Sequence, residues 1–127
     1  MTKLRFFKCN LCGNLDLELF QGGGQRVCCG QDMVELVPNK TDAATEKHVP
    51  VITRDGDTVK VHVSTVDHPM QEDHWITLIA VAYGNDYQVH WLNPGEAPEA
   101  TFTVPASEKV TAYEYCNLHG LWSAVEA

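Results

Sequence analysis

Four cysteines near the N-terminus have the spacing of a metal site. Cys9 and Cys12 form a C-x2-C pair, and Cys28 and Cys29 follow as direct neighbours. Four thiolates in a tetrahedral arrangement are typical of zinc or iron. A zinc ribbon, in which the metal only stabilises a small fold, usually takes its ligands from two C-x2-C pairs. The adjacent Cys28 and Cys29 fit that pattern poorly, so structural zinc and iron both remain open here.

A second set of possible ligands lies in the rest of the chain. Its members are His48, His68, His74, Cys116 and His119. Each falls in an expected loop or at a strand end, where side chains from different strands can converge. Imidazole and thiolate bind iron, copper and zinc alike, but five ligands are too many for tetrahedral zinc. If all five bind, four histidines in a plane and an axial cysteine leave one position open for a small molecule, which predicts a catalytic site.

The two remaining histidines are interpreted as surface residues. His62 alternates with Val61 and Val63, and His90 alternates with Val89 and Trp91. Successive side chains of a strand point to opposite faces, so each histidine is expected on the polar face of its strand. Neither is predicted to bind metal.

Three further motifs add to the N-terminal cysteines. They are Glu46-Lys47-His48-x-Pro50, His68-Pro69-Met70 and Cys116-Asn117-x-His119-Gly120-x-Trp122. Together the motifs resemble the desulfoferrodoxin family along essentially the whole chain, and the first segment resembles desulforedoxin with its Fe(Cys)4 centre. The resemblance implies a superoxide reductase, which reduces superoxide by one electron to hydrogen peroxide without producing dioxygen, in defence against oxidative stress.

The resemblance also implies roles for individual residues. Cys9, Cys12, Cys28 and Cys29 would bind a first iron. His48, His68, His74 and His119 would be the equatorial ligands of a second, reactive iron, with Cys116 as its axial ligand. Glu46 and Lys47 would flank the open position. From the residues alone, the favoured interpretation of Glu46 is an ordinary solvated loop carboxylate, and that of Lys47 an ordinary surface lysine.

The ligands of the first site lie on a small N-terminal segment, residues 1–37. Alternation over Leu15–Phe20 and the run Gly22-Gly23-Gly24 predict short hairpins and tight turns. So short a segment cannot bury a sufficient core alone, which favours stabilisation by a metal and by dimerisation. The polar stretch Pro38–Asp42 predicts a domain boundary, and residues 43–48 are expected to form one helical turn or an extended loop.

The ligands of the second site lie on residues 38–127, where hydrophobicity has a period of two. Val59, Val61 and Val63 alternate with polar residues, and the other expected strands are 75–83, 87–92, 100–104 and 109–115. Short strands separated by turn signals predict an immunoglobulin-like antiparallel β-sandwich. The predicted fold class is therefore mainly β, with a small metal-stabilised domain preceding the sandwich.

The composition limits the partners. Seventeen acidic against nine basic residues give a net charge of -8, which argues against nucleic acid and anionic membranes. No apolar run approaches the length of a membrane span. Five cysteines, four of them in the first 29 residues, fit metal binding in a reducing compartment and predict a cytoplasmic protein. The expected partners are superoxide, rubredoxin or a similar small redox protein as electron donor, and a second copy of the chain.

Two other classes of protein compete with this interpretation. A blue-copper protein can carry a C-terminal Cys-x2-His, but it uses two histidines and a weak axial methionine, and no methionine follows His119. A binding module stabilised by zinc, with incidental histidines, is the second alternative. A copper-containing protein would support the first alternative, and a colourless, iron-free protein would support the second.

Overall fold

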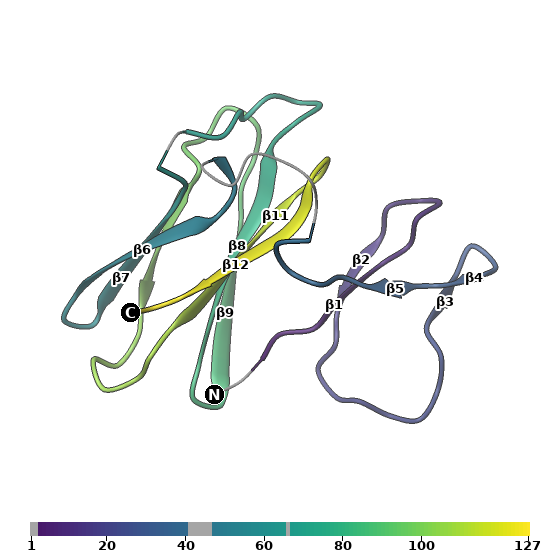
Figure 1. The fold of residues 1–127 in the computed structure, drawn as a ribbon, viewed down its shortest axis with the longest axis horizontal. Coiled ribbons are helices and arrows are strands. Elements are labelled where there is room, and N and C mark those ends of the chain that lie inside the picture. The colour runs from purple at the N-terminus through teal and green to yellow at the C-terminus, as the bar shows by residue number, and fades with distance from the viewer. Residues whose placement is uncertain (1–2, 41–46, 66) are drawn as a thin grey trace. The chain divides into compact units, whose positions relative to one another are not determined.

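The computed structural model describes residues 3–40, 47–65 and 67–127. These form two compact units, Lys3–Val37 and Pro38–Ala127, which are treated separately below. Every regular element of the described residues is a β-strand (Figure 1). No helix in these ranges is long and apolar enough to cross a bilayer.

The N-terminal unit consists of two small sheets. One has the strand order β2-β1-β5, and the other is the hairpin β3-β4. The strands are β1 (Phe6–Lys8), β2 (Leu15–Leu17), β3 (Val27–Cys28), β4 (Gln31–Asp32) and β5 (Val34–Glu35). Strands of two or three residues bury little apolar surface, so this unit depends on other contacts.

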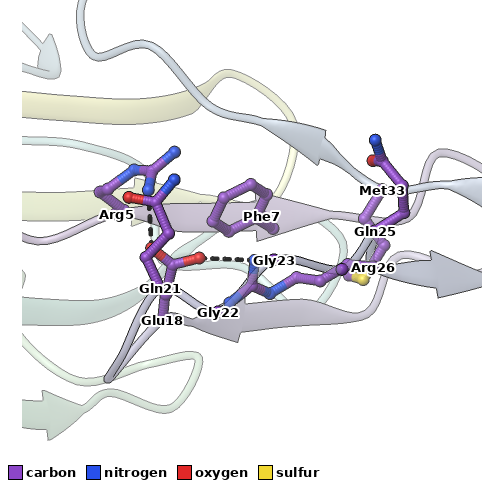
Figure 2. A pocket seen from close by; sticks show the side chains of 10 residues that line it. Arg5, Phe7, Glu18, Gln21, Gly22, Gly23, Gln25, Arg26 and Met33 are labelled. Carbon is purple, nitrogen blue, oxygen red and sulfur yellow. Dashed lines mark hydrogen bonds and ion pairs between the residues drawn. The ribbon is translucent and has the colours of Figure 1, made fainter.

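An ion cluster around Phe7 supplies part of that stability (Figure 2). The Glu18 side chain, only 6% exposed, lies 2.7 Å from Arg5 and 2.6 Å from Arg26. Both guanidinium groups lie over the Phe7 ring, at 5.4 Å and 4.2 Å from its centroid. Because Arg26 follows the glycine-rich loop, these contacts fasten that loop to β1.

The larger unit is a sandwich of two antiparallel sheets. Three strands have the order β10-β7-β6, and four have the order β12-β11-β8-β9. The strands are β6 (Pro50–Asp55), β7 (Thr58–Val63), β8 (Ile76–Tyr83), β9 (Asp86–Trp91), β10 (Glu99–Thr103), β11 (Thr111–Cys116) and β12 (Gly120–Val125). The prediction of a mainly β fold is confirmed.

The core of the sandwich follows the predicted alternation. Val59, Val61 and Val63 are fully buried on β7 and share one hydrophobic cluster with Ile79 and Val81 of β8. The expected strands over 75–83, 100–104 and 109–115 correspond to β8, β10 and β11. Two strands were not predicted: β6, which begins at a proline, and β12, which follows directly on the Cys116–His119 motif.

Strand β9 corrects one detail of the sequence interpretation. His90 is exposed, as expected, but its cross-strand partner is Ile79, a member of the hydrophobic core cluster, so it lies on the core-facing side of the sheet. Val89 and Trp91 point to the outer face and are 41% and 81% exposed. β9 is the edge of the four-stranded sheet, and side chains on both of its faces are exposed, so alternation of apolar and polar residues does not predict which face is buried there.

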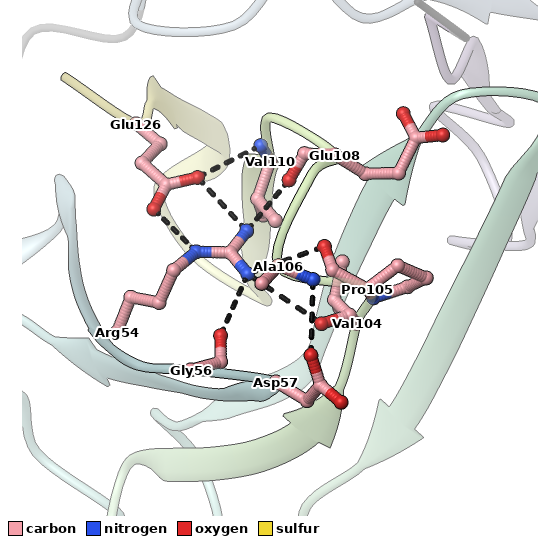
Figure 3. Close-up of polar contacts among 9 residues, drawn as sticks. All are labelled: Arg54, Gly56, Asp57, Val104, Pro105, Ala106, Glu108, Val110 and Glu126. Atoms are coloured by element: carbon pink, nitrogen blue, oxygen red, sulfur yellow. Dashed lines mark hydrogen bonds and ion pairs between the residues drawn. The ribbon is translucent and has the colours of Figure 1, made fainter.

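A cluster centred on Arg54 closes one end of the sandwich (Figure 3). Its guanidinium donates to both carboxylate oxygens of Glu126, at 2.7 Å and 3.0 Å, and to the backbone carbonyl of Glu108 at 2.7 Å. Glu126 also accepts from the Val110 amide at 3.1 Å. These bonds connect the end of β6 with the residue after β12 and with the chain entering β11.

Candidate metal centres

The four N-terminal cysteines converge as predicted. Their sulfur atoms lie within 4.8 Å of one another, with 3.6 Å between Cys12 and Cys28 and 3.9 Å between Cys28 and Cys29. Neighbouring side chains of a strand normally diverge. Here Cys29 has a φ of 55° and Gly30 a φ of 74°, so the chain turns through the left-handed region and both thiols face the same point.

This donor set fits a tetrahedral metal. Sulfurs bound at about 2.3 Å to one tetrahedral ion would be about 3.8 Å apart, close to the separations observed. The backbone N–H groups of Cys12 and Leu11 lower the pKa of Cys9 to about 6, which favours its thiolate. Hydrogen bonds with the Cys12 and Cys9 thiols raise the pKa of Cys28 to about 12, which favours its protonated form until a metal binds.

The second set converges from four separate parts of the sandwich. The five residues are His48 before β6, His68 and His74 between β7 and β8, Cys116 at the end of β11, and His119 before β12. All five donor atoms lie within 4.8 Å of one another. Ligands more than 60 residues apart in the sequence thus meet at one end of the sandwich.

The four imidazoles form a ring around a common centre. Nε2 of His48 lies 3.0 Å from Nδ1 of His119 and 3.2 Å from Nε2 of His68. Neighbouring rings are nearly perpendicular, at 75° to 85°. The Cys116 sulfur lies 3.4 Å from His68 Nε2 and 3.9 Å from His119 Nδ1.

These separations match a shared metal ion. Two nitrogens bound at about 2.1 Å and at a right angle are about 3.0 Å apart. The buried Nε2 of His74 has no hydrogen-bond partner among the described residues, and an unpaired buried acceptor is costly unless something binds it. His68 Nδ1 lies 2.6 Å from the Pro69 carbonyl; donation there leaves Nε2 free to bind metal.

Burial favours the neutral form of two of the imidazoles. It is the main cause that lowers the pKa of His68 to about 4, and it also lowers the pKa of His74. A neutral imidazole offers the lone pair that a metal needs. The same environment raises the pKa of Cys116 by burial, while the amides of Leu118 and His119 donate to its sulfur and oppose that rise.

Trp122 supports two of the histidines, a role that the sequence did not indicate. Its indole stacks on His48 with ring centroids 4.9 Å apart and an interplanar angle of 24°. Its Nε1 donates to the His119 carbonyl at 3.0 Å. Trp122 is 1% exposed, so it combines a core position with support for the site.

Glu114 was also missed. It lies on β11 two residues before Cys116 and is 0% exposed, and neither carboxyl oxygen has a hydrogen-bond partner within the described ranges. Desolvation by burial raises its pKa well above the usual range. A charged residue at this spacing from a ligand, on the buried face of a predicted strand, is the signal that sequence reasoning could have used.

The Glu114→Gln variant is expected to change how stability depends on pH. Above the unfolded-state pKa of about 4.3, the folded protein retains a proton that the unfolded chain has lost. Stability therefore falls with rising pH by about 1.4 kcal/mol per unit until the raised pKa is reached. Glutamine removes this pH dependence, so from about pH 5 upward the free energy of unfolding of the variant should increase relative to that of the wild type. Urea unfolding at several pH values measures the difference; the exposed Glu72→Gln is the control, and equal slopes for all three would contradict the assignment.

The other predicted site residues have different outcomes. Lys47 is exposed, and after burial and the His119 charge its own charge makes a smaller contribution to lowering the pKa of His74. Glu46 lies outside the described residues. His62 and His90 belong to neither cluster; His62 instead pairs with Asp67 at 3.2 Å.

Comparisons with known proteins agree with this geometry. Residues 40–125 match the family model described as desulfoferrodoxin, and residues 2–36 match the desulfoferrodoxin N-terminal domain. A desulfoferrodoxin of Nitratidesulfovibrio vulgaris is 50% identical over 124 residues, covering 97% of each chain. The crystal structure of the superoxide reductase from Treponema pallidum has a TM-score of 0.79 at 36% identity, covering 97% of this chain and 99% of that one.

Proposed function

Because the chain belongs to the desulfoferrodoxin family, it is an oxidoreductase that reduces superoxide, and we propose how its residues divide this work. The family and the two clusters indicate two mononuclear irons per chain, Fe(Cys)4 and Fe(His)4Cys. The convergence of four imidazoles and one thiolate supports the assignment of the reaction to the second cluster. One electron and two protons convert superoxide to hydrogen peroxide, and no dioxygen forms.

We assign the binding of the second iron to His48, His68, His74, His119 and Cys116. When bound, this iron supplies the electron. The Cys116 sulfur is a strong donor that favours loss of that electron, and the Leu118 and His119 amides tune how much charge it donates. The neutral imidazoles add no charge, so the cluster with one thiolate and a ferrous ion has a local positive charge that attracts an anion.

The reaction has a direct test in its stoichiometry. The reduced protein should give one hydrogen peroxide for each superoxide consumed and should release no dioxygen. A dismutase would give half as much peroxide together with dioxygen. Anaerobic measurement of peroxide and dioxygen distinguishes the two, and release of dioxygen would contradict the proposal.

Lys47 is proposed to attract superoxide. Its exposed side chain belongs to the residue before His48, and its charge contributes to the lowered pKa of His74, on a chain whose net charge is -8. Glu46 is proposed as its acidic counterpart beside the same site; that role rests on the motif Glu46-Lys47-His48 alone.

The Lys47→Ala variant should bind iron normally but react more slowly with superoxide. Loss of one nearby charge is expected to lower the bimolecular rate several-fold, up to about tenfold at low salt. Because salt screens steering, the wild-type rate should fall more steeply with ionic strength than the variant's. Pulse radiolysis over a salt series measures this, with Lys109→Ala as an exposed control. Equal rates and equal salt slopes for Lys47→Ala and the wild type would make Lys47 an ordinary surface residue.

The N-terminal unit, residues 1–37, is proposed as an iron-stabilised domain that is not required for the reaction, while residues 38–127 form the reductase domain. The Fe(Cys)4 centre of the N-terminal unit can accept electrons from rubredoxin or a similar small protein, because Cys12 and Cys29 are exposed. A cytoplasmic location is proposed because none of the five cysteines forms a disulfide, which fits a reducing compartment.

The protein is expected to be a homodimer held partly by the N-terminal unit. That unit exposes an unusual number of apolar side chains for its size: Leu11, Leu19, Phe20, Val27, Val34 and Val37. Burial of such a surface between two copies would offset the small core. Sedimentation equilibrium should give twice the chain mass at micromolar concentration, and Phe20→Glu should weaken the association. A monomer at every concentration would contradict the dimer.

A further inference from the structure

Asn117 connects the two segments that carry most of the second cluster. It follows Cys116 directly. Its Oδ1 accepts from the Trp75 backbone N–H at 3.0 Å, and its Nδ2 donates to the Asp73 carbonyl at 3.0 Å. Its own amide donates to the Trp75 carbonyl at 3.3 Å. The side chain therefore holds the backbone on both sides of His74.

The sheet by itself does not extend to this position. Strands β11 and β8 pair regularly up to Tyr115, where the register shifts, and Cys116 then lies opposite Ile76. His74 belongs to a tight turn that closes on itself, with reciprocal bonds to Gln71 of 2.9 Å and 3.0 Å. The Asn117 amide continues the pairing beyond the irregularity and joins this turn to the end of β11.

These hydrogen bonds of Asn117 affect the position of His74 relative to the other ligands of the second cluster. The ring of His74 lies 4.7 Å from His68 and 5.0 Å from His119 between centroids, and its Nε2 is buried without a partner among the described residues. A ring with no bond at that nitrogen is oriented by its backbone and its packing. Rotation of residues 73–75 would move Nε2 away from the common centre.

We infer that Asn117 is a positioning residue of the second cluster, which fixes His74 relative to Cys116 and thereby retains the metal. This inference rests on the proposed iron site. Asn117 itself is not assigned as a ligand, and its effect passes through the backbone around His74. Outer groups that orient metal ligands typically change metal affinity about 10–100-fold when removed.

Gln88 provides a matched control at a site without ligands. It is also a half-buried amide, and its Nε2 donates to the Tyr83 hydroxyl at 3.0 Å and to the Thr103 carbonyl at 2.9 Å. Gln88→Ala thus removes two amide hydrogen bonds, as Asn117→Ala does. A general loosening of the sandwich would affect both variants alike.

The experiment measures iron release from the full chain loaded with ferrous iron. The reduced proteins are mixed anaerobically with a chelator that forms a coloured complex with ferrous iron, and the release rate is followed by absorbance. The oxidised proteins are examined by electron paramagnetic resonance. Asn117→Ala should release the second iron about 10–100-fold faster than the wild type and alter its resonance, while Gln88→Ala should match the wild type in both. Asn117→Asp, which keeps the bond from Trp75 and loses the bond to Asp73, should fall between them and provides a second, nearly isosteric test.

The outcomes separate this inference from the function on which it rests. Wild-type release rates and an unchanged resonance in both Asn117 variants would overturn the positioning role, and so would equal acceleration by Gln88→Ala. In either case a wild type that binds two irons and reduces superoxide leaves the proposed function intact. A wild type without iron at the His4Cys cluster would overturn both.

Discussion

Replacement of Cys116 by serine is expected to lower the rate of superoxide reduction by about 100-fold or more. Cys116 is fully buried at the end of β11, and its sulfur is the one thiolate in a cluster of four imidazoles. A serine oxygen is a harder and poorer donor, so iron that remains bound would be less ready to give up its electron. Iron analysis together with pulse radiolysis separates loss of metal from loss of reactivity.

The matched variant is Cys12→Ser in the other cluster. It should disturb the Fe(Cys)4 centre, while a reduced second centre still consumes superoxide at close to the wild-type rate. Full turnover by Cys116→Ser would contradict the assignment of the thiolate. If Cys12→Ser abolished the reaction with the second iron still bound, electron transfer through the first centre would be essential, against the division of roles proposed above.

Replacement of Trp122 by alanine is expected to destabilise the protein by about 3–5 kcal/mol, because it leaves a cavity in the core. Trp122 is 1% exposed. The alanine variant also loses the stack on His48 and the hydrogen bond to the His119 carbonyl. The affinity of the variant for the second iron should therefore fall by more than the loss of folding stability alone explains. Urea unfolding of the iron-loaded protein and chelator competition measure the two effects.

Trp91 is the control, because it has the same side chain in an exposed position. It is 81% exposed at the edge of the sheet, so Trp91→Ala should change stability by no more than about 0.5 kcal/mol. Trp122→Phe retains the stacking area but not the N–H donor, and should lie between alanine and the wild type in iron affinity. Equal unfolding midpoints for Trp122→Ala and Trp91→Ala would contradict the role given to Trp122.

Local pattern was sufficient to predict most of the sandwich. The alternation of Val59, Val61 and Val63 indicated the buried face of β7 because the opposite sheet covers that face completely. The same reasoning failed for Val89 and Trp91, since β9 is an edge strand and the coverage of its faces depends on the opposite sheet. Strand β12 was missed because the apolar content of Gly120–Val125 is not strictly alternating, and pairing with β11 defines it as a strand.

The sequence by itself determined the chemistry of this protein. Thiolate and imidazole are intrinsic to residue type. The four N-terminal cysteines and the motifs around His48, His68 and Cys116 were together specific enough to indicate two metal centres and the family. Tertiary structure decided how the ligands meet and what holds them. The stack of Trp122 on His48 and the hydrogen bonds of Asn117 on both sides of His74 join residues that are distant in the sequence. The burial of the Glu114 carboxyl likewise comes from the elements packed around it. Such contacts depend on sheet register and on the packing of one element against another, and no local pattern encodes these distances.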